Sequence, residues 1–385
     1  MNVGDELVVD ISAVAHGGHF VARHEGRVIF VRHAISGEKV RVRVTEISKS
    51  FARADSIEVI KESTSRIVPA CEFARPDGCG GCDFQHIDPK AQRIFKSEII
   101  KEQFKRLAKM DIDVTVEEVL PILGWRSRME FTVSENRKVA MFQARSNKLI
   151  EIDDCKIAHQ GIDISKINSQ KLPVGKKVDV AISSDGKMIT SIEGRDSFEL
   201  VRQRVGNFDF TLTPASFWQS HIAAPETLLE CVLSFSGLRK GDHLYDLYSG
   251  VGLFASGAVD LVGETGRITM IEESAEAVTD ARRNFASYLN VEIVEGKVER
   301  ELKRFVRADV VIIDPPRAGA GERVIRQILA LAPRTLVYVA CDPAALARDT
   351  ALLERFDYTL DGIRAFDLFP MTQHIESVAR FIKRG

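Results

Sequence analysis

The chain has 385 residues, enough for two or three domains, and its 45% hydrophobic content is sufficient for a core in each. No apolar run reaches the roughly 18 residues that cross a bilayer, and the acidic start Met1–Glu6 lacks the features of a signal peptide, so we expect a cytoplasmic protein. Six cysteines in a chain of this length are not a disulfide framework and indicate metal binding or catalysis. The net charge of −2 restricts any nucleic-acid surface to a local patch.

Residues 1 to about 60 are predicted to form a small all-β unit. Its expected strands are short β-rich runs separated by glycine and polar residues: Leu7–Ile11, Arg27–Val31 and Lys39–Ile47. In the third run three valines alternate with Arg41 and Arg43, which places the arginines on the outer face. Lys49 and Arg53 extend this positive face, which is either an RNA-binding surface or an ordinary solvated strand.

A group of cysteines follows this unit. Cys79-Gly80-Gly81-Cys82 has a spacing that lets two thiolates face one ion, and the loop is polar rather than apolar. Cys71 precedes it, and Cys155 lies far downstream. Four cysteines can hold zinc or an iron–sulfur cluster, and spacing alone does not choose between them.

The segment from Asp88 to Met110 is predicted to be a helix, because Asp88 can cap it and Pro89 fits its first turn. One face is basic and is either a phosphate-contacting surface or simply solvated; its residues are Lys90, Arg93, Lys96, Lys101, Lys105, Arg106 and Lys109. Strands are then expected at 129–133 and 139–142, and residues 171–200 are strand-like without a usable motif.

From about Val205 the pattern changes to alternating strands and helices. A strand ends in Asp246, a glycine turn containing Gly250 and Gly252 follows, and a helix begins directly afterwards. The third glycine of a dinucleotide-binding loop is missing, which favours S-adenosylmethionine over a dinucleotide. About twenty residues on, a second strand ends in Glu272, where an acid can accept ribose hydroxyls.

Two later strands also end in reactive residues. Val310–Ile313 is followed by Asp314-Pro315-Pro316-Arg317, whose prolines force a loop that projects Asp314 over the sheet edge. The strand Leu336–Ala340 is followed by Cys341, which is either a nucleophile or a buried structural thiol. Without other information, the segment containing His374 and Glu376 is an ordinary loop entering a strand.

These motifs resemble those of a known family. The stretch Gly37–Glu46 with Phe51–Ala54 resembles the TRAM domain, a barrel similar to the oligonucleotide-binding fold. Four further motifs, in this order, resemble those of the RNA uracil-5-methyltransferases: Asp246-Leu-Tyr-Ser-Gly-Val-Gly252, Asp314-Pro-Pro-Arg317, Ala340-Cys-Asp-Pro343, and Phe369-Pro370 with His374-Ile-Glu-Ser377. Within that family, the bacterial type with an N-terminal TRAM domain and a [4Fe–4S] cluster is the most similar.

The resemblance implies an α/β protein with a Rossmann-like class I methyltransferase domain at 205–385. A TRAM barrel at 1–60 and a small β-rich iron–sulfur domain at 61–204 would precede it, with helix 88–110 packed on the catalytic domain. The implied reaction transfers a methyl group from S-adenosylmethionine to carbon-5 of a uridine in 23S ribosomal RNA or transfer RNA. The implied partner is RNA, with no membrane, and the protein is expected to be a monomer.

The resemblance also assigns roles to individual residues. Cys341 would be the nucleophile that adds to carbon-6 of the uracil, and Glu376 the base that removes the carbon-5 proton. The methyl-donor positions match Gln219, Tyr248, Gly250, Glu272 and Asp314. The cluster ligands match Cys71, Cys79, Cys82 and Cys155.

Three other functions are consistent with parts of the sequence. RNA cytosine-5 methylation also uses a cysteine after a strand, but the Phe-Pro and His-Ile-Glu-Ser motifs and the cysteine group disfavour it. A dinucleotide-dependent oxidoreductase lacks its third glycine here. A non-catalytic RNA-binding protein would have no need of Cys341 and Glu376.

Overall fold

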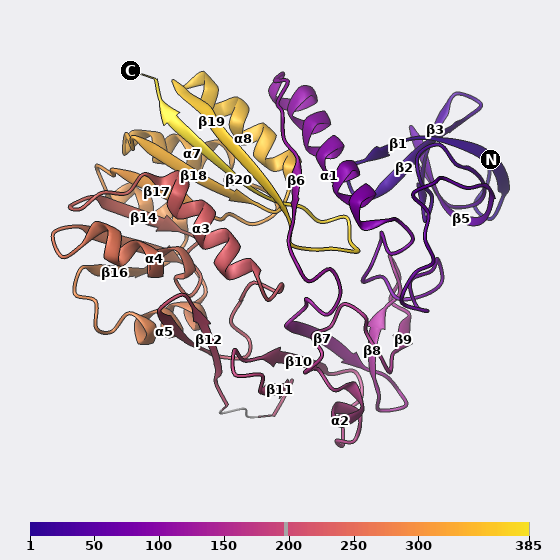
Figure 1. The fold of residues 1–385 in the computed structure, drawn as a ribbon, viewed down its shortest axis with the longest axis horizontal. Coiled ribbons are helices and arrows are strands. Elements are labelled where there is room, and N and C mark those ends of the chain that lie inside the picture. The colour runs from indigo at the N-terminus through magenta and orange to yellow at the C-terminus, as the bar shows by residue number, and fades with distance from the viewer. Residues whose placement is uncertain (196–198, 385) are drawn as a thin grey trace.

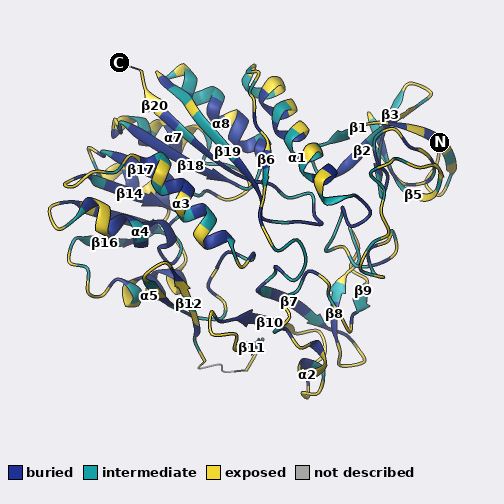
Figure 2. Ribbon diagram, viewed as in Figure 1, coloured by how far each residue is buried: buried dark blue, intermediate teal, exposed yellow. Residues whose placement is uncertain are grey.

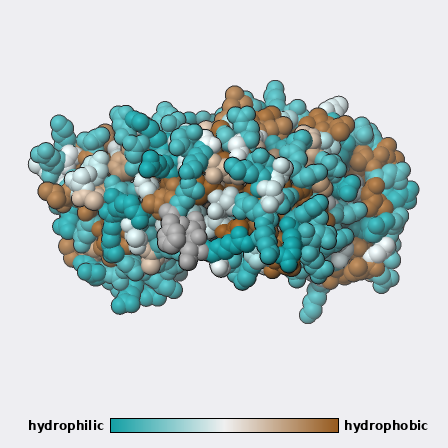
Figure 3. Space-filling view, turned by 90° about the horizontal axis from the view of Figure 1, so that it is seen from below, coloured by the Kyte–Doolittle hydropathy of each residue, from teal (hydrophilic) through white to brown (hydrophobic). Residues whose placement is uncertain are grey.

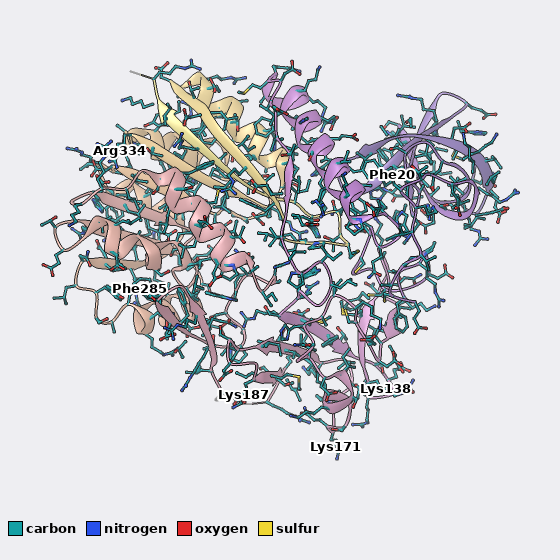
Figure 4. The ribbon with its side chains drawn as sticks, viewed as in Figure 1. Phe20, Lys138, Lys171, Lys187, Phe285 and Arg334 are labelled. Atoms are coloured by element: carbon teal, nitrogen blue, oxygen red, sulfur yellow. The ribbon has the colours of Figure 1, made fainter. Side chains whose placement is uncertain are left out.

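In the computed structural model, residues 1–195 and 199–384 are described, and they form a β-barrel, a small central sheet and a large α/β unit (Figure 1). The barrel is closed, with strand order β1-β2-β3-β5-β4. Its strands are β1 (Glu6–Ala15), β2 (His19–His24), β3 (Arg27–Arg32), β4 (Lys39–Ile47) and β5 (Phe51–Lys61). Val40, Val42 and Val44 of β4 are buried as predicted, and Phe20 lies inside the barrel (Figure 4). The alternating pattern therefore gave the correct inner and outer faces.

The central sheet has the strand order β11-β10-β7-β8-β9. Its elements are β7 (Arg128–Val133), β8 (Val139–Phe142), β9 (Leu149–Glu151), α2 (Ile164–Asn168), β10 (Lys177–Ile182) and β11 (Met188–Ile192). Part of the strand-like stretch 171–200, residues 196–198, lies outside the described residues. A hairpin of β12 (Val201–Val205) and β13 (Phe208–Leu212) follows, and it packs into the core of the α/β unit. The expected domain boundary at 204 and 205 falls within this hairpin, and the domain limits stay a prediction.

The α/β unit contains an eight-stranded sheet in the order β16-β15-β14-β17-β18-β20-β19-β6. All neighbouring strands are parallel except at β20, which is antiparallel to both β18 and β19. The strands are β14 (His243–Leu247), β15 (Arg267–Glu272), β16 (Val291–Glu295), β17 (Val310–Ile313), β18 (Thr335–Ala340), β19 (Tyr358–Asp367), β20 (Glu376–Lys383) and β6 (Val116–Glu118). The central strands are almost continuously buried, as expected for a sheet covered on both faces (Figure 2).

Helices cover both faces of this sheet. One face packs against α3 (Ala224–Ser236), α4 (Leu253–Val262) and α5 (Ala275–Asn284). The other packs against α1 (Pro89–Gln103), α6 (Val298–Glu301), α7 (Gly321–Ala330) and α8 (Pro343–Arg355). Asp88 caps α1 and Pro89 begins it, as predicted, and the helix continues as a π-helical turn at Phe104–Ala108. Because α1 and β6 pack on this unit, the chain enters the catalytic fold long before β14.

The barrel touches the α/β unit through the turn between β1 and β2. His16 Nε2 lies 3.0 Å from Asp342 Oδ2, and Asp342 also caps α8 by accepting from the Ala345 N–H. Within the described residues no helix is long and apolar enough to cross a membrane. Seen from below, the surface is mostly hydrophilic, with apolar residues scattered between polar ones (Figure 3).

Candidate active site and cysteine cavity

One cleft of about 770 Å³ lies at the carboxyl edge of the large sheet, where ligands bind in open α/β folds. All seven residues predicted for catalysis or donor binding line it: Gln219, Tyr248, Gly250, Glu272, Asp314, Cys341 and Glu376. Most follow the ends of parallel strands, and Glu376 begins the antiparallel β20. The strand order therefore brings side chains from distant parts of the chain to a single place.

The glycine turn after β14 is held by the end of β15. Glu272 accepts hydrogen bonds from the Gly250 N–H at 2.9 Å and the Ser274 N–H at 2.7 Å. Gly252 must be glycine, because its φ is +95° and a Cβ would lie 2.4 Å from the Phe285 ring. The Glu272 carboxylate keeps further acceptor capacity on the cleft side of this turn.

Asp246 lies beneath the turn and is fully buried. Its Oδ2 accepts from the Ala255 N–H at 3.1 Å, while Oδ1 has no hydrogen-bond partner among the described residues. Burial raises the pKa of Asp246 to about 8. The negative charges of Asp314 and Glu272 act in the same direction, and the hydrogen bond from Ala255 acts against it. Asp246 thus ties the end of β14 to the first turn of α4.

Cys341, Glu376 and Asp314 lie close together in the cleft. Burial, together with the negative charges of Glu376 and Asp314, raises the pKa of the Cys341 thiol to about 12. Burial also raises the pKa of Asp314 to about 7 and that of Glu376 well above its usual value. Arg317 acts in the opposite direction, because its cation lowers the pKa of both Cys341 and Glu376.

Arg317 and Phe217 are among the cleft residues that were not singled out from the sequence. Arg317 belongs to a recognised motif, but only the fold shows that it lies beside Cys341. Phe217 precedes Trp218 and Gln219 and is 68% exposed, although it is a large aromatic residue. Trp218 is buried and anchors this loop. The signal available in the sequence was the pair of adjacent aromatic residues, Phe217 and Trp218.

The four cysteines predicted as metal ligands line one cavity in the central region, together with apolar side chains such as Phe73 and Ile152. Burial raises the pKa of Cys79 and Cys155, and it raises that of Cys82 to about 12. In the described part of the chain, no three His, Cys, Asp or Glu side chains converge closely enough to hold a metal ion. The thiols therefore share a cavity without forming a ready site for a single ion.

In both predicted basic surfaces some of the cations are paired with carboxylates. On the barrel, Arg41 pairs with Glu58 at 2.8 Å and Arg43 pairs with Glu6 at 3.0 Å, so carboxylates on neighbouring strands neutralise both. On α1, Lys96 is completely buried and pairs with Asp367 at 2.6 Å. Lys96 is therefore a packing residue and not part of a phosphate-contacting face.

Comparison with known proteins agrees with this architecture. Residues 1–57 match the TRAM domain, and residues 177–384 match the family described as tRNA (Uracil-5-)-methyltransferase. Proteins named as uncharacterized RNA methyltransferases from Streptomyces avermitilis and Streptomyces coelicolor are each 38% identical to this chain. The match covers 98% of this chain in both cases, and 98% and 93% of the relatives.

A solved structure shares the fold over nearly the whole chain. The Pyrococcus abyssi tRNA (uracil-54, C5)-methyltransferase, in complex with S-adenosyl-L-homocysteine, superposes with a TM-score of 0.75. It is 22% identical, and the match covers 97% of this chain and 99% of that one. The sheet order, the TRAM barrel and these matches lead to one conclusion: the chain belongs to the tRNA (uracil-5-)-methyltransferase family of RNA methyltransferases.

Proposed function

We propose that the protein transfers a methyl group from S-adenosylmethionine to carbon-5 of a uridine in RNA through a covalent adduct with Cys341. The observation that carries this proposal is the placement of Cys341 and Glu376 at one sheet edge, in the same cleft as the glycine turn and Glu272. Transfer RNA and 23S ribosomal RNA are the two candidate substrates.

The chemistry requires a nucleophile and a base on the same uracil. The Cys341 thiolate adds to carbon-6, forming a C–S bond and an enolate whose carbon-5 is nucleophilic. The donor supplies the methyl group, which carbon-5 takes as the donor leaves as the neutral sulfide. Glu376 then removes the proton from carbon-5, the C–S bond breaks, and the carbon-5 to carbon-6 double bond is restored.

The thiol must lose its proton before it attacks, since its pKa is about 12 in the free protein. Arg317 favours the thiolate electrostatically, and the neighbouring Asp314 carboxylate can accept the thiol proton, which leaves Glu376 free to take the proton from carbon-5. These groups interact strongly, so they titrate as a set rather than one by one. Arg317 is therefore proposed to assist formation of the nucleophile.

The target base must leave its stack to reach Cys341. Enzymes that modify a base in this way flip it into a pocket or act on unpaired RNA. The exposed ring of Phe217 lines the cleft and offers a surface on which a base can stack. Tyr248, Gly250, Glu272, Asp314 and Gln219 are proposed to hold the donor.

We further propose that Cys71, Cys79, Cys82 and Cys155 hold a [4Fe–4S] cluster. Four thiols around one largely apolar cavity suit such a cluster, because a [4Fe–4S] cubane takes four cysteine ligands. When bound, the cluster would tie together the loops that carry Cys71, Cys79 and Cys82 with the one that carries Cys155. The proposed division is a barrel at 1–60, a cluster region at 61–204, of which α1 and β6 pack on the α/β unit, and a catalytic region at 205–385, in a cytoplasmic monomer.

The direct test is mass spectrometry of nucleosides. Transfer RNA and 23S ribosomal RNA from a deletion strain are incubated with purified protein and S-adenosylmethionine. We expect 5-methyluridine to appear at one position in one of the two RNAs. Formation of 5-methylcytidine instead would support the cytosine-5 alternative, and binding without any methylation would support a non-catalytic role.

A further inference from the structure

Another cavity, of about 320 Å³, lies between the barrel and the central region. Strands β2, β3, β4 and β5 form one side, and the turn between β8 and β9 forms the other. None of the residues that line it lines the cleft of Cys341. Its volume lies in the range of small-molecule sites.

Two arginines from different parts of the fold converge on one side chain in this cavity. Arg53 Nη1 of β5 lies 3.3 Å from His19 Nε2, and Arg145 Nη2 of the β8–β9 turn lies 2.8 Å from the same nitrogen. Burial and the three nearby arginines lower the pKa of His19 to about 4, so the ring is neutral. Because two guanidinium donors face Nε2, the tautomer that fits carries its proton on Nδ1 and accepts at Nε2. One lone pair cannot satisfy two guanidinium groups, each with five N–H donors.

The positive charges of this cavity are only partly compensated. Arg32 forms two hydrogen bonds to Asp55, at 2.7 and 2.8 Å, and is neutralised. The Nε of Arg53 lies 3.3 Å from Glu46, whose side chain is half exposed. Arg145 has no carboxylate within 4.0 Å among the described residues. The cavity thus contains N–H donors and positive charge that the protein itself does not fully satisfy. A phosphate suits this site, because two of its oxygens can accept the paired N–H groups of a guanidinium.

The same cavity contains an aromatic wall. The Arg53 guanidinium lies over the rings of Phe30, at 5.9 Å, and Phe51, at 5.3 Å. Phe30 is half-buried and lines the cavity, with the His19 ring edge-on to it at 6.3 Å. Stacked arginine and aromatic groups form the kind of platform on which nucleic-acid bases bind without sequence preference.

The backbone of Arg145 adopts a left-handed conformation in a turn that is packed against the Cys79–Cys82 loop. Its φ is +54°, a conformation that non-glycine residues adopt only when their surroundings fix it. The Gly80 N–H donates to the Phe142 carbonyl at 2.9 Å, and a Cβ on Gly80 would lie 2.8 Å from the backbone of Ala144. The loop containing Cys79 and Cys82 therefore supports the turn that presents Arg145.

We propose that this interdomain cavity binds one nucleotide of the substrate RNA other than the target uridine. Its phosphate lies against Arg53 and Arg145, and its base lies against Phe30. This inference rests on the proposed RNA methyl transfer and adds to it a second anchor point that spans the barrel and the central region. Within the positive face predicted for the barrel, it assigns the RNA contact to Arg53 rather than to Arg41 and Arg43, which pair with Glu58 and Glu6.

The test compares Arg145→Ala and Arg53→Gln with Arg41→Ala as a matched control. Binding of a fluorescein-labelled twelve-nucleotide oligouridylate is measured by anisotropy at several salt concentrations. We expect the two cavity variants to bind about 5- to 50-fold more weakly, with a salt slope smaller by about 0.7 for one lost phosphate contact. Arg41→Ala should stay within about twofold of wild type, and Arg145→Lys should recover part of the loss. Equal losses in Arg41→Ala and Arg145→Ala, or none in Arg145→Ala, would overturn the proposal.

Two further measurements locate the contact and separate it from the chemistry. A 4-thiouridine-containing oligouridylate should crosslink to peptides from 27–32 or 143–147, and crosslinks confined to cleft peptides would refute the site. With methylatable RNA, Arg145→Ala should raise KM and leave kcat within about twofold. If Arg145→Ala has the KM of the wild type, the cavity proposal is refuted and the proposed function stands. If the wild-type protein itself methylates no RNA, the proposed function is refuted.

Discussion

Cys341 and Glu376 lie opposite each other where β18 ends and β20 begins. Ala340 pairs with Ser377 in the antiparallel register, so the next facing positions are Cys341 and Glu376. Because β20 runs against its neighbours, a residue at the start of a strand reaches the carboxyl edge of the sheet. This reversal places Glu376, the proposed base, beside Cys341, the proposed nucleophile, which precedes it by 35 residues (376 minus 341).

The donor pocket is tested at Glu272. Glu272→Ala removes both the acceptor proposed for the ribose and the group that pins the Gly250 N–H. We expect S-adenosylmethionine binding to weaken by roughly 1–3 kcal/mol in calorimetry, as for a charge-assisted hydrogen bond. Glu272→Gln keeps one acceptor oxygen and should lose less. Unchanged donor affinity in Glu272→Ala would disprove this role. Binding of NAD in the same calorimetric titration would restore the oxidoreductase alternative.

The pH dependence is tested at Arg317. Its cation lowers the pKa of Cys341 and of Glu376, so Arg317→Gln should raise both. The rising limb of the rate–pH profile, which reports loss of a proton from this set, should move to higher pH. Alkylation of Cys341 by iodoacetamide, followed by peptide mass spectrometry, should shift in the same direction without any RNA. A profile and alkylation curve identical to wild type would show that Arg317 does not act on the thiol.

The cluster proposal predicts colour and iron content. Protein purified without oxygen should be brown and contain about four irons per chain. Cys82→Ala should be poorly soluble, because cluster ligation contributes to folding. Cys231 is a buried cysteine outside this cavity, so the Cys231→Ala protein should keep its iron and serves as the control. Colourless protein with one zinc per chain would contradict the assignment.

Much of the fold follows from local patterns. β17 is a run of four β-branched residues bounded by Asp314 and two prolines, so its limits could be read from the sequence. The valines of β4 alternate, and this gave their burial correctly. β6 could not be predicted, because it has three residues and its partner β19 lies more than two hundred residues away.

The charged residues show the same limit. Lys96 was placed on an exposed helical face, but its partner Asp367 lies 271 positions along the chain and buries it. Likewise, nothing local to Arg145 indicates that it meets His19 of the barrel. The motifs identified the cleft residues, whereas pairing across domains depends on tertiary structure that spacing does not encode.

The covalent mechanism is tested most directly by a denaturing gel of two variants with substrate RNA and S-adenosylmethionine. Glu376→Gln keeps the thiolate but lacks the base, so methyl transfer occurs once and the adduct cannot eliminate. We predict a slow-migrating protein–RNA band for Glu376→Gln and none for Cys341→Ala. Cys341→Ala turnover at the wild-type rate, or normal product release by Glu376→Gln without a band, would contradict the mechanism.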